Sequence, residues 1–172
     1  MIYRDDDIFL TESPRGFGEY YDFVKFKECH EYFKKAKVKH VLAIVASEIW
    51  NHPELVEYLK ENKEDFEFGI HGWAHERYSE WKEEAIYKSL NRAKNTIEEV
   101  FETRCHWFFP PWNKRNDDMY KACERLELKL NDSFVVPHEA LDGKDADALC
   151  FHFWEDTERE LIKQYLETYA KN

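Results

Sequence analysis

HVLAIVA, residues 40–46, is a nearly continuous apolar run that contains β-branched side chains. A run of this kind is typical of a strand that is covered on both faces, as the strands of a parallel sheet are. Helical spacing of apolar residues lies on both sides of it. These positions are Phe26, Cys29, Phe33 and Ala36 before the run, and Leu55, Val56 and Leu59 after it, behind Pro53. The sequence therefore predicts a buried strand between two helices.

The same alternation continues to the end of the chain. Further strands are predicted over 66–70, 105–109, 128–131 and 148–154, and Pro110 and Pro111 end the second of these. The helices between and after them are marked by Ile86, Leu90, Ala93, Ile97 and Phe101, by the segment 117–126, and by Leu161, Ile162, Tyr165, Leu166 and Tyr169. Alternating strands and helices predict an α/β fold with a parallel sheet, either open or closed into a small, irregular barrel.

Composition limits the classes of function. A chain of 172 residues, 43% hydrophobic and 35% charged, is expected to form one domain spanning 1–172 with a well-solvated exterior. The formal net charge of -11 disfavours binding to nucleic acid or to an anionic membrane, which both need clustered Lys and Arg. A neutral or cationic substrate fits this charge better.

The termini and the cysteines add two expectations. The first ten residues, MIYRDDDIFL, are acidic where a signal peptide would be basic, and no later run approaches membrane-spanning length, so we expect a cytoplasmic protein. The four cysteines are Cys29, Cys105, Cys123 and Cys150. They are far apart and form no C-x-x-C pair, so we expect reduced, mostly buried thiols.

Polar side chains follow four of the predicted strands. The clusters are Asp5 to Asp7 after the first candidate strand, His71 and His75 after 66–70, residues 110–113 after 105–109, and His152 near the end of 148–154. Loops at the carboxyl ends of parallel strands converge on one face. We therefore expect all four clusters at one active face.

Two of these clusters could hold a metal ion. His71 and His75 lie four residues apart, within reach of one cation, and a carboxylate from Asp5 to Asp7 could be the third ligand. Two histidines and one carboxylate suit Zn(II) and other divalent transition metals such as Co(II). The alternatives are a chance pair of surface histidines and a solvated acidic cap at the start of the chain.

Hydrolysis of an amide needs an activated water, a base, stabilisation of the oxyanion and an acid for the leaving amine. A second carboxylate that does not bind the metal can be the base, and we assign this role to Asp6. His152 can protonate the departing nitrogen because imidazole titrates near neutral pH. The alternative for His152 is a hydrogen-bonded histidine of the core.

The order of these motifs, Asp-Asp, His-x-x-x-His, Pro-Pro-aromatic and a late Leu-x-x-His, resembles the polysaccharide deacetylases of carbohydrate esterase family 4. The resemblance implies an irregular (β/α) barrel, here in minimal form with about six or seven parallel strands. It also implies residue roles: Asp6 as base, Asp7, His71 and His75 as metal ligands, and His152, in Leu149 to His152, as general acid.

The third motif departs from the family pattern. It reads Phe109-Pro110-Pro111-Trp112, and the resemblance gives Trp112 the backbone N–H that faces the oxyanion, with Pro111 beside it. Trp73 and Trp112 each lie inside a motif and could also stack on the apolar face of a sugar ring. Phe109 stands where the family has the arginine that pairs with the base, so Asp6 needs another partner, for which Arg4 is a candidate. The Asp-rich fourth motif, which orients the acid histidine, has no clear counterpart. A divergent branch of the family is therefore expected.

The function expected from these residues is removal of an N-acetyl group from a sugar or saccharide conjugate by a metal-dependent hydrolase. Two alternatives stay open. The same site could act on another C–N bond, because fold and metal do not fix the substrate. The chain could also be a glycan-binding module without catalytic activity, because the motif arginine is missing.

Overall fold

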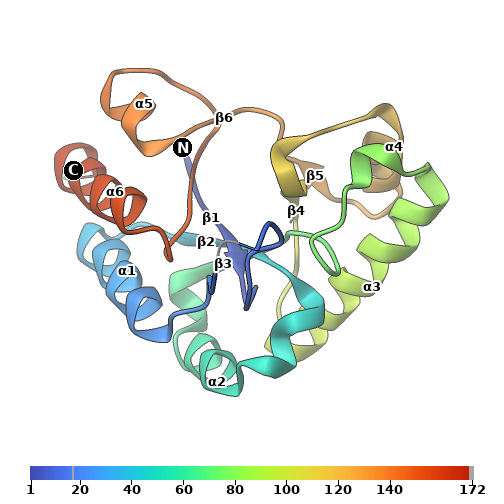
Figure 1. The fold of residues 1–172 in the computed structure, drawn as a ribbon, viewed down its shortest axis with the longest axis horizontal. Coiled ribbons are helices and arrows are strands. Elements are labelled where there is room, and N and C mark those ends of the chain that lie inside the picture. The colour runs from blue at the N-terminus through green and yellow to red at the C-terminus, as the bar shows by residue number, and fades with distance from the viewer. Residues whose placement is uncertain (17, 171–172) are drawn as a thin grey trace.

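The parallel sheet expected from the alternating pattern runs through the centre of the molecule (Figure 1). The computed structural model describes residues 1–16 and 18–170. Within them the sheet has seven strands in the order β5-β4-β3-β2-β1-β7-β6, and every neighbouring pair is parallel. The strands are β1 (Ile2–Ile8), β2 (His40–Ile44), β3 (Phe66–Ile70), β4 (Trp107–Phe108), β5 (Lys129–Leu130), β6 (Phe134–Val135) and β7 (Ala148–Phe151).

Helices connect these strands and surround the sheet. The α-helices are α1 (Phe23–Ala36), α2 (Pro53–Glu61), α3 (Glu83–Phe101), α4 (Asp117–Arg125), α5 (Pro137–Leu141) and α6 (Asp156–Tyr169). Short 3₁₀ helices are η1 (Ala46–Asn51), η2 (Lys63–Asp65), η3 (Tyr78–Glu80) and η4 (Pro111–Asn113). The sheet curls into a half-barrel with the helices outside it (Figure 1), so the predicted minimal, irregular (β/α) barrel is confirmed.

The core lies between the sheet and the helices, where the sequence pattern predicted it. All five residues of β2 are buried. The five apolar residues predicted to face inward from α3 are also all buried, which fixes this 19-residue helix against the sheet. Within the described residues, no helix is both long and apolar enough to cross a membrane. The four cysteines are free and buried, as expected.

Three local predictions were wrong in extent. The predicted strands 105–109, 128–131 and 148–154 are observed as the shorter β4, β5 and β7. The two-residue strand β6 and the five-residue helix α5 were missed, because elements this short show no periodicity. Tyr169, one of the residues that mark the predicted last helix, is 53% exposed at the end of α6.

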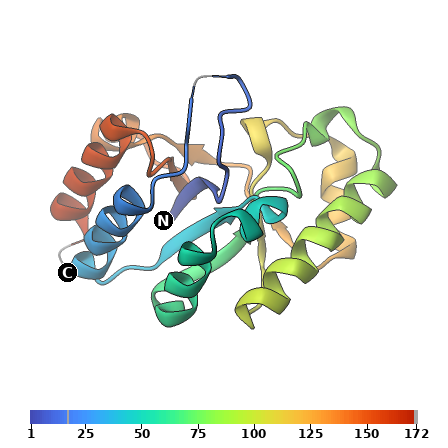
Figure 2. The same cartoon turned by 60° about the horizontal axis from the view of Figure 1, so that its bottom comes forward.

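The segment between β1 and α1 stands away from the rest of the fold above the sheet (Figure 2). A single antiparallel bridge between Glu12 and Glu19 closes it. The ring of Tyr20 stacks on Trp154 at 3.8 Å between centroids, which fastens the segment to the loop after β7. This segment therefore forms one wall above the carboxyl ends of the central strands.

Candidate metal centre and active site

A bulge in β1 determines how its three aspartates point. Asp5 pairs with Leu42 and Ile8 with Ile44, so β1 has one extra residue relative to β2 between these positions. Asp7 occupies this irregularity with a left-handed φ of 63°, a conformation that Asp adopts more readily than most residues. Bulges re-aim side chains and occur often beside active sites. As a result, both Asp6 and Asp7 line the same cleft.

Asp5, in contrast, points to the helix-covered face. Its Oδ2 lies 2.8 Å from His40 Nε2, and its Oδ1 accepts a hydrogen bond of 2.9 Å from the backbone N–H of Phe153. Complete burial raises the pKa of Asp5 well above its usual value. The expectation that all three aspartates share the active face is therefore wrong for Asp5, because successive side chains of a regular strand alternate between the faces.

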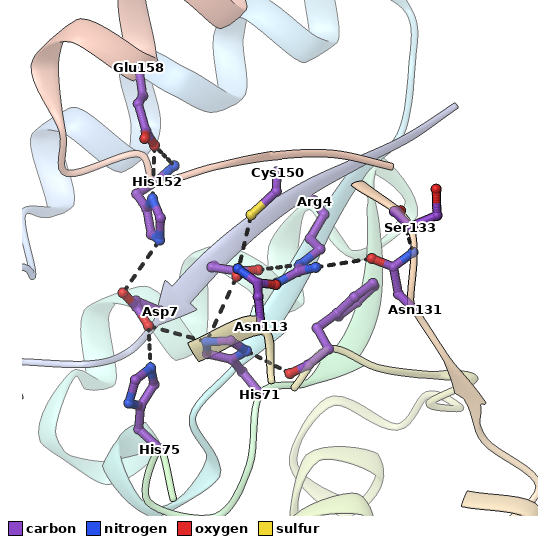
Figure 3. Close-up of polar contacts among 12 residues, drawn as sticks. Arg4, Asp7, His71, His75, Asn113, Asn131, Ser133, Cys150, His152 and Glu158 are labelled. Carbon is purple, nitrogen blue, oxygen red and sulfur yellow. Dashed lines mark hydrogen bonds and ion pairs between the residues drawn. The ribbon is translucent and has the colours of Figure 1, made fainter. Parts of the chain in front are cut away.

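His71 is held in the tautomer that a metal ligand needs. Its Nδ1 lies 2.7 Å from the carbonyl oxygen of Phe109. A carbonyl only accepts hydrogen bonds, so in the neutral ring Nδ1 carries the hydrogen and Nε2 keeps its lone pair. That lone pair faces Asp7, whose Oδ1 is 3.3 Å from Nε2 (Figure 3). A backbone carbonyl that orients a histidine in this way is a common outer contact of metal sites.

His75 completes a three-residue cluster around the same oxygen. His75 has a left-handed φ of 58°, and its Nε2 lies 3.1 Å from Asp7 Oδ1. One donor atom from each of Asp7, His71 and His75 lies within 4.8 Å of the others. Asp7 Oδ1 is buried and has no hydrogen-bond partner in the structure.

These donors fit a divalent cation. An unpaired buried carboxylate oxygen is costly, and a metal ion between it and two imidazole nitrogens would compensate for that cost. Two histidines and one carboxylate suit Zn(II) or a neighbouring transition metal.

Arg4 holds the second carboxylate of the cleft. It is fully buried, and its Nε and Nη2 donate hydrogen bonds of 2.6 and 2.5 Å to the two carboxylate oxygens of Asp6. Burial raises the pKa of Asp6, but the guanidinium outweighs it and leaves the pKa lowered. Arg4 therefore fixes Asp6 in place of the missing motif arginine, and its Cζ lies 5.0 Å from the ring of Phe109.

Two asparagines that sequence reasoning missed use the remaining donors of Arg4. Nη2 donates to Asn113 Oδ1 at 2.7 Å, and Nη1 donates to Asn131 Oδ1 at 3.0 Å. The sequence offered a signal for each: Asn113 follows the Pro-Pro-Trp motif, and Asn131 ends a predicted strand. With four hydrogen bonds to three side chains, the guanidinium is fixed in one orientation toward Asp6.

Glu158 contacts and orients His152, a role for which the sequence showed no clear candidate. Its Oε2 accepts from both the backbone N–H and the Nδ1 of His152, each at 2.8 Å. The other ring nitrogen, Nε2, points into the cleft and lies 3.7 Å from Asp7 Oδ2 (Figure 3). Burial lowers the pKa of His152, but the hydrogen bond and charge of Glu158 outweigh burial and raise it to about 9. His152 is therefore protonated at neutral pH in this arrangement.

The predicted aromatic residues separate into two places. Trp112 lines the cleft with Asp6, Asp7, His71, His75 and His152, and the cleft has a volume of about 260 Å³. It follows the buried Pro111 and adopts a left-handed φ of 63°, a rare conformation for a bulky side chain. Trp73 does not line this cleft. It borders a separate hollow near Trp50, and its ring lies 3.6 Å from the Arg92 guanidinium.

Comparison with known proteins gives a match to one family. The sequence profile of the polysaccharide deacetylase family matches residues 24–130, which include His71, His75 and the Pro-Pro-Trp motif. Because the match covers more than half of the chain, this protein belongs to the polysaccharide deacetylase family. No curated protein matches the sequence.

Solved structures share the fold at low sequence identity. A family 4 pseudoenzyme from Bacillus anthracis is 15% identical, with a TM-score of 0.72 over 86% of this chain and 56% of that one. The peptidoglycan deacetylase PdaC from Bacillus subtilis is also 15% identical, with a TM-score of 0.73 over 98% of this chain and 81% of its own. A family 4 acetyl xylan esterase from Clostridium thermocellum, solved with a cobalt ion, is 14% identical, with a TM-score of 0.70 over 97% and 83%.

The chain is shorter than several of these proteins. It spans 56% and 59% of the chains of the Bacillus anthracis pseudoenzyme and of a mutant of it with restored activity. Structures that share this fold thus include both active enzymes and a pseudoenzyme, so the fold alone does not establish catalysis.

Proposed function

We propose that this chain is a metal-dependent hydrolase that removes an N-acetyl group from a sugar or saccharide conjugate. The observation that carries the proposal is the convergence of five side chains on one cleft: Asp7, His71 and His75 as a ligand set, with Asp6 and His152 on either side of it. A structural zinc site would use four protein ligands and be closed, whereas this set supplies three and opens on the cleft.

The ligand set is proposed to bind Zn(II), with Co(II) as the next candidate. When bound, such a cation lowers the pKa of water and polarises an acyl oxygen. The chain's own contribution is to hold the ligands ready. The carbonyl of Phe109 fixes the ring of His71, and the bulge in β1 directs Asp7 to both histidines.

Asp6 is the proposed base. Its carboxylate is ionised and held by Arg4, so it can take the proton from the attacking water while its position stays fixed. His152 is the proposed acid: Glu158 keeps its ring protonated, and the free Nε2 can give that proton to the leaving nitrogen as the C–N bond breaks. The two groups have pKa values displaced in opposite directions, as base and acid of one reaction require.

Trp112 and Pro111 are proposed to form the oxyanion side of the cleft. Pro111 has no backbone N–H, so Trp112 is the residue of this pair that can donate one to developing negative charge. Its left-handed backbone and the following left-handed Asn113 are held in place by the contact between Asn113 and Arg4. Strained backbone maintained by buried hydrogen bonds is frequent at functional sites.

Acetate release from a panel of N-acetylated sugars tests the proposal. We expect no release with a chelator and recovery when Zn(II) or Co(II) is added. Asp6→Asn should abolish turnover with metal content unchanged, and His75→Ala should lose both. The exposed Asp145→Asn and His138→Ala are matched controls that should change neither.

One specific observation favours a second candidate, a glycan-binding module: Phe109 replaces the motif arginine, and pseudoenzymes share this fold. This candidate predicts saturable binding of sugar with no acetate released under any metal supplement. Cleavage of another amide, with sugars left intact, would support the same site acting on a different substrate.

A further inference from the structure

Two arginines from different loops flank one tryptophan at the rim of the cleft. The Cζ of Arg15, in the segment after β1, lies 4.8 Å from the centre of the Trp112 ring. The Cζ of Arg77, in the loop after β3, lies 4.6 Å from the same ring. Trp112 and Arg15 both line the cleft that contains Asp7 and the histidines. Two positive charges are thus held beside the entrance to the candidate catalytic groups.

Neither arginine has a carboxylate partner among the described residues, although acidic residues outnumber basic ones by 36 to 25 in this chain. The carboxylate adjacent to Arg77 in the sequence, Glu76, faces inward, where it accepts hydrogen bonds from Tyr78 Oη at 2.6 Å and Ser89 Oγ at 2.9 Å. By contrast, Arg4, Arg125 and Arg159 are each paired with a carboxylate. The two rim arginines are therefore available to an external anion.

The guanidinium N–H groups of Arg15 and Arg77 make no hydrogen bond to the other described residues; Arg15 donates only its backbone N–H, to Ser13 Oγ. A guanidinium in cation–π contact can still present such donors to the oxygens of a carboxylate or phosphate. Contact with Trp112 also restricts both side chains before a ligand arrives, so less conformational freedom is lost on binding. The rim is thus preorganised to receive one anionic group.

The charges at the bottom of the cleft do not prevent an anionic group from binding at the rim. Asp6 is paired with Arg4, and Asp7 is surrounded by His71, His75 and His152. The net charge of -11 repels an extended polyanion such as a nucleic acid. A small ligand with a single anionic group, however, is attracted by the two nearby arginines. The net charge of the whole chain therefore does not require a neutral or cationic substrate at this site.

We propose that the acylated sugar bound in this cleft carries one carboxylate or phosphate, and that Arg15 and Arg77 bind that group beside Trp112. This inference rests on the proposed function only in taking an acylated sugar as the ligand. The anion is held at the rim while the acyl group lies deeper, at the ligand set. Arg15 and Arg77 then determine which sugars are accepted, and they are not catalytic residues.

Equilibrium binding to the metal-free chain, residues 1–172, tests the inference without turnover. The probes are N-acetylglucosamine, N-acetylglucosamine 6-phosphate and N-acetylmuramic acid, which are neutral, phosphorylated and carboxylated. We expect at least one anionic probe to bind roughly tenfold more tightly than the neutral one, and added salt to reduce that difference. A preference for phosphate or for carboxylate identifies which anion the rim selects.

Arg15→Gln and Arg77→Gln should each weaken binding of the anionic probe by roughly tenfold and leave the neutral probe unchanged. Arg92→Gln is the matched control, because Arg92 is also exposed and stacked on a tryptophan, but outside the cleft. The proposal is overturned if anionic probes bind no more tightly than the neutral probe, or if the rim variants weaken all three alike. Acetate release is measured separately with Zn(II) present. If anionic preference persists but no probe releases acetate, the proposed function fails and the inference about the rim stands.

Discussion

Replacing Arg4 by methionine should strongly destabilise the protein, because it leaves the buried carboxylate of Asp6 without its counter-ion. The guanidinium donates two hydrogen bonds to Asp6 and one each to Asn113 and Asn131 from a fully buried position. Removing one partner of a buried ion pair costs about 3–5 kcal/mol. In a domain of this size, each kcal/mol shifts the melting temperature by about 2–4 °C. We therefore expect Tm of the metal-free Arg4→Met protein to fall by roughly 6–20 °C.

A double-mutant cycle separates this effect from lost packing. In Arg4→Met/Asp6→Asn the uncompensated charge is removed, so we expect this protein to recover at least half of the lost stability. Arg125→Met is the matched control: Arg125 also contacts two carboxylates, at 2.9 and 3.1 Å, but at the surface, where ion pairs contribute little. Thermal and denaturant unfolding measure the wild type, Arg4→Met, Asp6→Asn, the double variant and Arg125→Met. The reasoning is refuted if Arg4→Met unfolds at the wild-type temperature, or if adding Asp6→Asn lowers stability further.

The remaining predictions concern the acid, the metal and the packing beneath the cleft. In metal-free protein, the pKa of His152 followed by NMR should be about 9 and should fall in Glu158→Gln. This pKa is raised above the unfolded value of about 6.5. The contact between His152 and Glu158 therefore stabilises the folded protein fully below pH ~6.5, and this contribution is lost as pH rises through about 9. The prediction is contradicted if the stability of Glu158→Gln changes with pH over this window as steeply as that of the wild type. Added Zn(II) at ~100 times its dissociation constant should stabilise the chain by about 2.7 kcal/mol, and His71→Ala should abolish that shift in Tm; an equal shift in the variant would place the metal elsewhere. Gly69→Ala should destabilise by about 1–3 kcal/mol, because the added Cβ would lie 2.5 Å from Cε2 of Phe109, and Gly69→Ala/Phe109→Leu should regain part of the loss if this contact is the cause.

Fold class and much of the core were predictable because their signals are local. The strand β2 follows from one apolar run, and the buried face of α3 follows from spacing of three and four residues. Each pattern reflects which neighbours share a face of one element. The ends of β4 and β7 were not predictable, since a strand stops where its pairing partner stops, and the partner lies far away in the sequence.

The candidate site divides in the same way. The sequence supplied the donor types, the His-x-x-x-His spacing and their positions after strands, and it suggested Arg4 as the partner of Asp6. It did not show that Asp7 shares the cleft with Asp6 rather than the face of Asp5, because the bulge in β1 appears only when that strand is paired with β2. Nor did it connect His152 to Glu158, whose position depends on how the first turn of α6 packs against the end of β7.

By itself, the sequence determined the α/β class, the helical and strand faces, and a set of side chains chemically able to bind a metal. Only the tertiary structure decided that two distant segments bring Asp7, His71 and His75 around one point, and that Arg15 and Arg77 meet at one tryptophan. The physical reason is the distance along the sequence over which each feature is determined. Periodicity is set by neighbours a few residues apart, whereas a site depends on strand order, register and loop course, which form together when the sheet assembles.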